Sequence, residues 1–377
     1  MSKTAKIIVG LIVIILIIWG ISAATKKGGA PTSSEPIKIG FIGPLTGNAA
    51  NVGQNAKAAI EIALSEVNAD GGINGRPLEI IYEDGKCTSK DAAAAAQKLI
   101  NVDKVPVVFG GACSGETSAF TGLAEQSKTV VLSYCSSAAA ITNAGDYIFR
   151  NYPSDNFQGV FAADYIKNKL NKSKVAILYI QTDWGIGLNE TFSKKFVELG
   201  GTVVASEGFQ ETNKDFRSQL SKIKVANPDV IYFLGYAGQT VPALKQLADL
   251  KYKVSMFGGD AWDDQQIITD AGSAAEGIYF TVPSSSPSEI FKTAMKTKVG
   301  TDEIAVCTPT AYDGVHILAQ VLKNAGVEPT AIKDELYKTV YAGGVSSKEI
   351  SFDSNGDPKT ADYTVKIVKN GKIEVVQ

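Results

Sequence analysis

Two apolar runs in the first half of the chain end in the same kind of turn. The run at 105–109, VPVVF, leads into the small and hydroxyl-bearing residues 110–115, GGACSG. The run at 129–132, TVVL, leads into a similar turn at 133–137, SYCSS, and the segment between the two turns has helical content. This order predicts a βαβ unit with parallel strands, whose two turns lie at the carboxyl ends of the strands.

The same alternation of strands and helices continues along the chain. Before this unit, strands are expected at 37–42 and 77–83, each followed by a helix. After Asp146 a second series follows, with strands expected at 174–180, 202–208, 229–234 and 254–257. Repeated strand–turn–helix order predicts parallel sheets that are covered by helices on both faces. We therefore expect an α/β fold with two doubly wound lobes.

Three further segments are expected to cross between the lobes as strands and to form a multi-strand hinge: 147–151, 277–283 and 345–352. The expected boundaries are 37–148 plus 284–347 for the first lobe and 149–283 plus 348–377 for the second. At the end of the chain, 364–368 and 372–376 are expected to form a hairpin. Their connection, Asn370-Gly371, is typical of a type I′ turn.

The amino terminus has the pattern of an export signal or a membrane anchor. Two lysines precede an apolar run at 7–19, which continues through 20–24. Residues 22–24, SAA, fit a cleavage site, whereas the whole run approaches the roughly 17–25 residues of a spanning helix. We favour an uncleaved anchor over 1–24 and leave cleavage open. Residues 25–36 are expected to be a flexible tether, and the rest of the chain to lie outside the cytoplasm.

Composition argues against several classes of function. The 377 residues carry a net charge of −2, so the chain lacks the excess of positive charge that is typical of nucleic-acid-binding proteins. His316 is the only histidine and lies in an apolar helical pattern, so histidine-based triads and multi-histidine metal sites are not expected. The glycine-rich stretch 40–47, GFIGPLTG, lacks the spacing of a dinucleotide loop, so no cofactor is expected. The chain also lacks a GxSxG elbow, and we do not expect an enzyme.

The two hydroxyl-rich turns have two interpretations. In open α/β sheets, ligands bind at the carboxyl ends of the strands. Small residues there let a ligand approach the backbone, and hydroxyls with free amides can hold a carboxylate. Alternatively, both turns only cap helices, since serine before a helix is a common cap. The turns alone do not decide between these interpretations.

Several short motifs together resemble those of a known family. They are 39–47 (IGFIGPLTG), 68–75 (NADGGING), 82–84 (YED) with Cys87, 110–114 (GGACS), 133–137 (SYCSS), 157–159 (FQG) and 274–277 (AAEG). From about Ile37 to its end, the chain resembles the type I periplasmic solute-binding proteins, specifically the leucine/isoleucine/valine-binding proteins of amino-acid ABC transporters. The resemblance implies the type I periplasmic binding protein fold, in which two lobes close over a ligand.

The resemblance also implies roles for residues of a ligand site. Ser114 matches a serine whose hydroxyl and amide hold the ligand carboxylate. Ser137 matches a threonine that contacts both the carboxylate and the ammonium group. Cys135 matches a position whose backbone carbonyl accepts from the ammonium, and Ser136 offers a backbone amide. Asp260 matches an acidic residue, usually glutamate, that pairs with the ammonium.

Three positions that match the walls of the pocket complete the implied site. Tyr236 matches an aromatic contact from the second lobe, and Trp184 matches an aromatic wall position. Val52 stands where the family often has an aromatic residue over the ligand. The side-chain pocket is therefore expected to be wider or less aromatic than in the family.

The four cysteines allow three pairings, and their spacing does not choose among them. No CxxC pair is present, which argues against a zinc site. The resemblance implies a Cys87–Cys113 disulfide, which would brace the turn that carries Ser114. Cys135 and Cys307 are then left over. We favour free buried thiols for these two, with a second bridge as the alternative.

The function implied by the resemblance is that of an extracytoplasmic solute-binding protein of an ABC importer. Closure of the lobes would capture an amino acid, branched-chain or similar, and present it to the permease. The alternatives are a ligand-sensing ectodomain of a signalling system and a binder of a small amide or carboxylate. The expected partners are the small-molecule amino acid, the permease subunits and, through the N-terminal segment, the membrane. The protein is expected to be a monomer.

Overall fold

The computed structural model describes residues 35–300 and 304–376. The residues from Ile37 onward belong to one compact unit. The predicted anchor or signal at 1–24 and most of the predicted tether lie outside the described residues. Among the helices that the structure does describe, none has the length and apolar character needed to cross a membrane.

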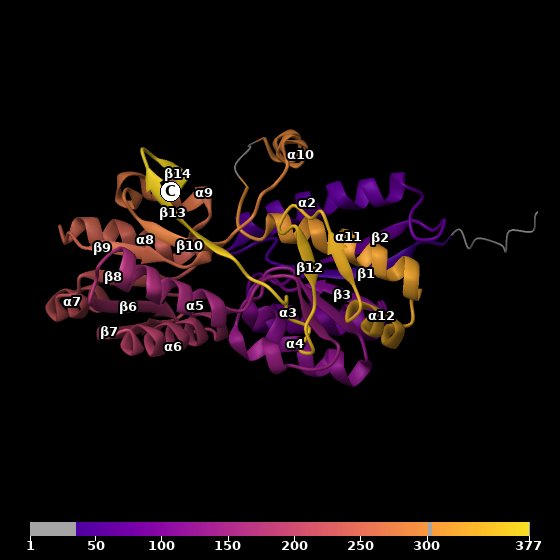
Figure 1. Cartoon of the computed structure of the whole chain (residues 1–377), viewed down its shortest axis with the longest axis horizontal. Helices are drawn as coiled ribbons and strands as arrows, with labels where there is room; N and C mark the ends of the chain where they lie inside the picture. The colour runs from indigo at the N-terminus through magenta and orange to yellow at the C-terminus, as the bar shows by residue number, and fades with distance from the viewer. Residues whose placement is uncertain (1–34, 301–303, 377) are drawn as a thin grey trace, which may run out of the picture. The chain divides into compact units, whose positions relative to one another are not determined.

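The first lobe is built on a parallel five-stranded sheet in the order β2-β1-β3-β4-β5 (Figure 1). Its strands are β1 (Ile37–Gly43), β2 (Leu78–Asp84), β3 (Val107–Gly110), β4 (Val130–Ser133) and β5 (Ile148–Arg150). The helices that cover this sheet are α2 (Ala50–Ala69), α3 (Ser89–Gln97), α4 (Ser114–Ser127), α11 (Thr308–Ala325) and α12 (Pro329–Leu336).

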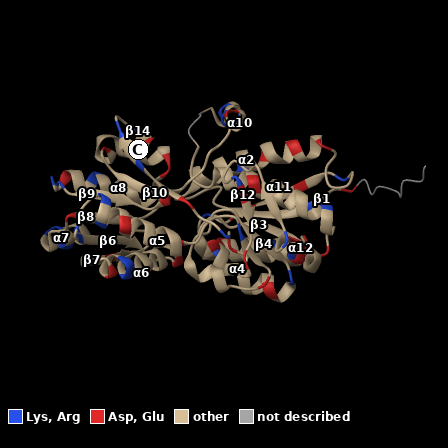
Figure 2. Ribbon diagram, viewed as in Figure 1, with Lys and Arg blue, Asp and Glu red and all other residues tan. Residues whose placement is uncertain are grey.

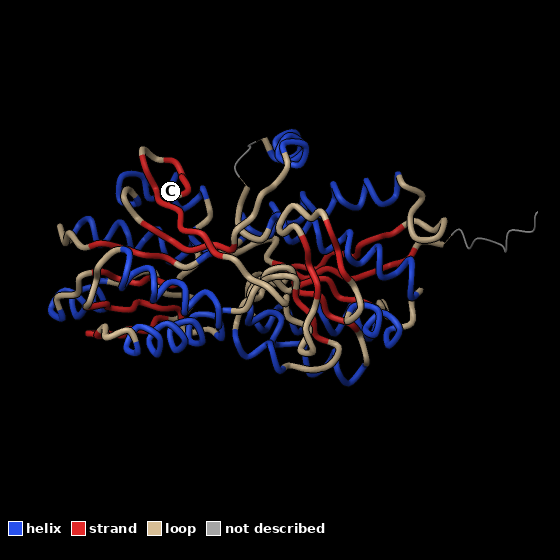
Figure 3. The backbone as a smooth tube through the Cα atoms, viewed as in Figure 1, coloured by secondary structure: helices blue, strands red, loops and turns tan. Residues whose placement is uncertain are grey.

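Both faces of the first sheet are buried, because successive strand residues point to opposite sides. Phe41 and Phe109 pack in the cluster that contains α2, α11 and α12. Their neighbours Ile42 and Val108 pack in the cluster that contains α3 and α4. Figure 3 shows helices on both sides of the strands. This burial explains why the strands are almost unbroken apolar runs in the sequence.

The second lobe is built on a seven-stranded sheet in the order β14-β13-β10-β9-β8-β6-β7. Its strands are β6 (Lys174–Ile180), β7 (Thr202–Phe209), β8 (Val230–Leu234), β9 (Ser255–Gly258), β10 (Tyr279–Pro283), β13 (Tyr363–Lys369) and β14 (Lys372–Val375). The helices around it are α5 (Asp155–Asp164), α6 (Asp183–Glu198), α7 (Arg217–Ala226), α8 (Ala237–Asp249) and α9 (Gln265–Ala271).

Strands β6 to β10 of this sheet run parallel, whereas β13 is antiparallel to β10 and to β14. The connection between β13 and β14 has φ of 54° at Asn370 and 69° at Gly371. Two positive φ angles are what a type I′ turn requires, so the predicted hairpin and its turn are confirmed.

Three smaller elements are added to the two lobes, besides short 3₁₀ and π-helical segments. Helix α10 (Glu289–Val299) packs on α2 of the first lobe. Strands β11 (Val340–Ala342) and β12 (Glu349–Ser351) form a two-stranded antiparallel sheet. Basic and acidic residues are scattered along the ribbon of both lobes, in keeping with the small net charge (Figure 2).

The chain passes between the two sheets three times, after β5, after β10 and after β12 (Figure 1). All three predicted crossing strands are sheet strands instead. Segment 147–151 contains β5, which is paired with β4. Segment 277–283 contains β10, which is paired with β9 and β13, and segment 345–352 contains β12, which is paired with β11. Their backbone groups are satisfied inside sheets, so the crossings themselves are the irregular segments that follow.

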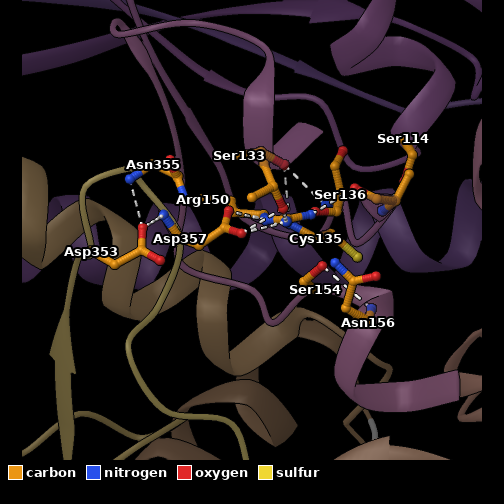
Figure 4. Close-up of polar contacts among 12 residues, drawn as sticks. Ser114, Ser133, Cys135, Ser136, Arg150, Ser154, Asn156, Asp353, Asn355 and Asp357 are labelled. Carbon is orange, nitrogen blue, oxygen red and sulfur yellow. Dashed lines mark hydrogen bonds and ion pairs between the residues drawn. The ribbon is translucent and has the colours of Figure 1, made fainter. Parts of the chain in front are cut away.

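A buried ion pair links the first crossing to the third. Arg150, at the end of β5, is fully buried. Its Nε lies 2.6 Å from Asp357 Oδ1 and its Nη2 lies 2.7 Å from Asp357 Oδ2. The same guanidinium donates to the backbone oxygen of Ser136 (3.3 Å) in the second hydroxyl-rich turn (Figure 4) and to that of Ala138 (2.9 Å), directly after the turn. The third crossing is thereby attached to this turn.

Candidate ligand-binding cleft

The first turn, between β3 and α4, is held by a buried carboxylate. Glu116 accepts from the backbone N–H groups of Cys87 (2.9 Å), Ala112 (2.9 Å) and Cys113 (3.0 Å). Burial raises the pKa of Glu116 to about 7, although the three amides act to lower it. The disulfide Cys87–Cys113 ties the same turn to the loop after β2, as the resemblance implied. The start of α4, with Ser114, is therefore fixed from two sides.

The second turn, after β4, is bonded to the first. The Ser133 hydroxyl donates to the Gly111 carbonyl at 2.7 Å and accepts from the Ser136 amide at 3.0 Å. The amide of Ala138 donates to Ser114 Oγ at 3.0 Å. With its oxygen accepting from Ala138, the Ser114 hydroxyl keeps its own proton for another acceptor. Figure 4 shows Ser133 and Ser136 near Arg150, with Ser114 on the far side of Ser136.

The two turns and three segments of the second lobe enclose a small cavity. The space in which the centre of a water molecule can move is about 40 Å³. One water needs about 10–15 Å³ by this measure, so the cavity suits a small guest. It is lined by Ala49, Val52, Ala112, Cys113, Ser114, Cys135, Ser137, Trp184, Tyr236, Ala237, Asp260, Ala261, Asp264, Val306 and Cys307.

Asp260 is the acidic group that the second lobe brings to this cavity. It lies in a single 3₁₀ turn after β9 and is 5% exposed. The Tyr152 hydroxyl donates to its Oδ2 at 2.6 Å, and the Ala261 amide donates to its Oδ1 at 2.9 Å. Burial raises the pKa of Asp260, although both hydrogen bonds act to lower it. The Tyr152 hydroxyl and the Ala261 amide therefore fix the position of the carboxyl, but neither carries a positive charge that would balance the carboxylate.

A second buried acid lies close to Asp260. Asp155, the first residue of α5, is fully buried, and its Oδ2 has no hydrogen-bond partner among the residues that the structure describes. Burial raises the pKa of Asp155 well above its usual value, and repulsion by Asp260 raises it further. A cation held beside Asp260 would relieve part of this repulsion, so the cavity is electrostatically suited to an ammonium group.

Aromatic and apolar side chains form the remaining walls. The Trp184 and Tyr236 rings are stacked with centroids 5.1 Å apart and an interplanar angle of 20°. They come from the starts of α6 and α8, so both stand at carboxyl ends of strands. Val52, on α2, faces the same cavity from the first lobe. The walls combine a flat aromatic surface with a small aliphatic one.

The lobes touch each other at the edge of the cavity. Asn51 Nδ2, in α2, donates to Asp264 Oδ1 of the second lobe at 2.6 Å. Asn48 Oδ1 accepts from Lys214 Nζ at 3.3 Å, and a Cβ on Gly238 would lie only 2.4 Å from the same oxygen. Because Gly238 has no side chain, the turn between β1 and α2, which carries Asn48, can lie against α8. The two lobes are thus in contact at the edge of the cavity.

Cys135 and Cys307 form a second disulfide, which corrects our preference for free thiols. Their Cα atoms lie 5.3 Å apart although 172 positions separate them in the sequence. The preference was wrong because the sequence does not show that α11, with Cys307 as its N-cap, starts next to the second turn. Both half-cystines line the cavity.

The structure brings six of the seven predicted site residues to one cavity and leaves Ser136 outside its lining. The Ser136 amide already donates to Ser133, and its hydroxyl lies 2.7 Å from Thr117 Oγ1. The sequence reasoning missed Tyr152, Asp155 and Asp264. The available signals were weak: Tyr152 and Asp155 follow a predicted crossing, and Asp264 follows Asp260 in an acidic turn.

The described residues contain no group of three or more His, Cys, Asp or Glu side chains that could hold a metal ion. The lining of the cavity includes the hydroxyls of Ser114 and Ser137 and the buried carboxyl of Asp260. This arrangement has the chemistry to bind a small molecule that carries a negative and a positive charge.

Comparisons with known proteins also point to a protein that binds small molecules. The family model described as "Periplasmic binding protein" matches residues 36–372. The leucine-, isoleucine-, valine-, threonine- and alanine-binding protein of Pseudomonas aeruginosa is 29% identical over 339 residues, which cover 88% of this chain and 90% of that protein.

Solved structures resemble the chain over nearly its whole length. A leucine-binding protein from Thermotoga maritima aligns with a TM-score of 0.83 and 28% identity, covering 90% of this chain and 98% of the other. The substrate-binding protein of a branched-chain amino-acid transporter from Streptococcus pneumoniae, in complex with isoleucine, aligns with a TM-score of 0.82 and 29% identity. That alignment covers 91% of this chain and 99% of the other.

Proposed function

The chain belongs to the periplasmic binding protein family, whose model matches residues 36–372, and on this premise we propose that it is the extracytoplasmic solute-binding protein of an ABC importer. Its ligand is an amino acid, branched-chain or similar. The names of the Pseudomonas, Thermotoga and Streptococcus proteins support this choice of ligand class.

The observation that carries the proposal is the pairing of opposite chemistries across the cavity. Ser114 and Ser137 stand on the first lobe and Asp260 on the second, and all three line the cavity. In the proposed complex the two hydroxyls donate to the ligand carboxylate. Asp260 and the backbone carbonyl of Cys135 accept from its ammonium group.

The binding free energy expected from these contacts corresponds to the affinity proposed for a solute receptor. Each charge-assisted hydrogen bond contributes roughly 1.5–3 kcal/mol. Five or six of them, less the costs of closure and of ordering the ligand, reach about −8 kcal/mol, which corresponds to micromolar binding. In the proposed complex Trp184, Tyr236 and Val52 enclose the ligand side chain. Ser136 acts indirectly, by holding the turn through Ser133 and Thr117.

Capture is proposed to proceed by closure of two lobes, 37–148 plus 284–347 and 149–283 plus 348–377, about the three crossings. Contacts at the cavity edge, such as Asn51 to Asp264, support a closed state in which ligand and lobes contact each other. The closed form would present the ligand to a membrane permease, and the N-terminal segment would keep the monomeric receptor at the outer face of the membrane.

The proposal is tested by thermal denaturation in the presence of the proteinogenic amino acids, small amides and short carboxylates. Binding to the folded state at 100 times Kd stabilises it by about 2.7 kcal/mol, so a true ligand raises Tm by several degrees. Ser137→Ala should reduce the shift strongly at the same ligand concentration, and Ser127→Ala, which changes an exposed serine at the end of α4, should keep it. A panel in which no amino acid raises Tm would contradict the proposal.

The transport role needs a cellular test. Deletion of the gene should remove uptake of the labelled ligand at low concentration, and re-expression of the full chain should restore it. Unchanged uptake, together with a lost transcriptional response to the ligand, would point to sensing instead.

A further inference from the structure

Asp264 is a buried carboxylate on the cavity wall that none of the roles above uses. It is the N-cap of α9 and is 2% exposed. Its Oδ1 accepts from Asn51 Nδ2 at 2.6 Å and from the Gln266 amide at 2.9 Å. Its other oxygen, Oδ2, has no hydrogen-bond partner within residues 35–300 and 304–376. One acceptor therefore remains for a guest in the cavity that the residue lines.

Two contacts favour a role for Asp264 toward the ligand side chain rather than toward its charged groups. Ser114, Ser137 and Asp260 are engaged by the two charged groups of the proposed ligand. Asp264 is instead bonded to Asn51, whose neighbour Val52 lies on the wall proposed to enclose the ligand side chain. The cavity, with about 40 Å³ for the centre of a water molecule, suits a compact ligand.

An aliphatic side chain would leave this acceptor unsatisfied. Once a guest covers this oxygen, leaving it without a donor costs free energy, which a guest with a hydrogen-bond donor at that point avoids. Sites built to bond a substrate hydroxyl therefore reject analogues that lack it much more strongly than apolar pockets reject an added hydroxyl. A neutral hydroxyl satisfies the free oxygen of Asp264 without the cost of desolvating a second cation in the cavity.

We propose that Asp264 accepts a hydrogen bond from a hydroxyl on a short ligand side chain, so that the cleft prefers a β-hydroxy amino acid to its aliphatic counterpart. This inference rests on the proposed function and narrows its ligand class. L-Threonine and L-valine are the matched probes, because they differ by a hydroxyl in place of a methyl group.

The experiment measures Kd for both probes by isothermal titration calorimetry, on protein that has been unfolded, dialysed and refolded to remove bound ligand. L-Threonine is expected to bind at least about tenfold more tightly than L-valine, the smaller end of what one hydrogen bond to a charged group provides. L-2,3-Diaminopropionate, whose side chain carries an amine, is expected to bind more weakly than L-threonine.

The informative variant is Asp264→Thr, because threonine keeps a side-chain oxygen for the helix cap and replaces the second oxygen with a methyl group. It should lose the preference for L-threonine or reverse it. Asp264→Asn, which keeps hydrogen-bonding capacity at both positions, should retain part of it. Asp270→Thr makes the same chemical change at an exposed position of α9 and should leave both Kd values unchanged.

Three other outcomes would contradict the inference, and they can be told apart. If L-valine binds as tightly as L-threonine, or if Asp264→Thr keeps the parental ratio, the inference is wrong while the proposed function stands. Tightest binding of the diamine would show that Asp264 recognises a cation and would also overturn the inference. If no amino acid binds the refolded parent protein, the proposed function itself fails, and the inference fails with it.

Discussion

At the scale of single residues, three buried carboxyls around the cavity differ in how they are compensated. Glu116 receives three backbone amides, whereas Asp260 receives one amide and one tyrosine hydroxyl. Asp155 keeps an oxygen without a partner among the described residues. Buried acids without a compensating charge lower the stability of the fold. A ligand cation bound beside Asp155 and Asp260 would supply that charge.

Replacing Asp260 by asparagine separates binding from folding. Asp260→Asn should weaken amino-acid binding by at least about tenfold, because an amide cannot pair with the ammonium group. The Tm of the ligand-free protein should stay the same or rise, since burial raises the pKa of Asp260 and the charged form is disfavoured. Calorimetry and thermal denaturation measure the two effects. Asp249→Asn, at an exposed site on α8, should change neither.

Glu116 should make stability depend on pH. Its pKa is raised from 4.5 to about 7 by burial, so the folded protein holds a proton that the unfolded chain has lost. The contribution of Glu116 to the free energy of unfolding is therefore fully present below about pH 4.5 and is lost as pH rises towards 7. Glu116→Gln should flatten urea-unfolding free energies measured across this range. Equal slopes in both proteins would assign the pH dependence to other groups.

At the scale of elements, both turns at the carboxyl ends of β3 and β4 are tied to distant segments. Cys87–Cys113 joins the first turn to the loop after β2, and Cys135–Cys307 joins the second turn to the start of α11. Hydrogen bonds from Ser133 to Gly111 and from Ala138 to Ser114 connect the two turns. Irregular backbone is thereby held in place without regular secondary structure, as a binding site requires.

Removing the two disulfides should have unequal effects. In the chain-entropy account, a bridge across a separation of 26 stabilises by about 3.5 kcal/mol and one across 172 by about 5 kcal/mol. Paired Cys→Ser variants should follow this order in denaturant unfolding, with Cys135/Cys307 the less stable. Peptide mapping under native conditions checks the pairing first. An opposite order would show that local strain or residual unfolded structure outweighs loop length.

At the scale of the whole molecule, the described lobes are joined by three crossings and by contacts at the edge of the cavity. The Arg150–Asp357 pair connects the first crossing to the third and reaches the second turn through the Ser136 carbonyl. Movement of one lobe against the other must therefore occur in the crossings, while the turns remain attached to their own lobe. This division suits a receptor that closes as two rigid bodies.

Closure can be tested through a contact that no ligand group makes. Asn51→Ala removes the hydrogen bond to Asp264 across the lobes and should lower affinity about three- to tenfold by destabilising the closed state. Small-angle scattering with ligand at a fixed subsaturating concentration should show a larger average radius in the variant. Lys57→Ala, further along α2, is the control. Parental affinity in Asn51→Ala would mean that this bond does not influence closure.

Much of the fold could be predicted from local patterns. The apolar runs that became β3, β4, β6 and β8 are buried on both faces, so their composition shows their environment. The Asn370-Gly371 turn is equally local, because two positive φ angles restrict the residue types. The predicted crossing strands at 147–151, 277–283 and 345–352 were wrong, since a short apolar strand looks the same whether it spans a hinge or pairs inside a sheet.

The candidate site could be predicted only where a local motif marks it. Ser114, Cys135 and Ser137 stand in turns that directly follow strands, which are recognisable in the sequence. Tyr152 and Asp264 reach the site through partners 108 and 213 positions away, Asp260 and Asn51. No local pattern reports a contact over such separations.

The sequence by itself determined that strands alternate with helices, that hydroxyl-rich turns follow two of the strands, and that one histidine leaves little room for histidine chemistry. Hydrophobic periodicity and turn chemistry act over a few residues and can be read there. Only the tertiary structure decided that Cys135 meets Cys307, that Asp155 lies beside Asp260, and that Asp264 closes the wall at Asn51. Such meetings depend on how two sheets are oriented across three crossings, which is a property of packing rather than of any short segment.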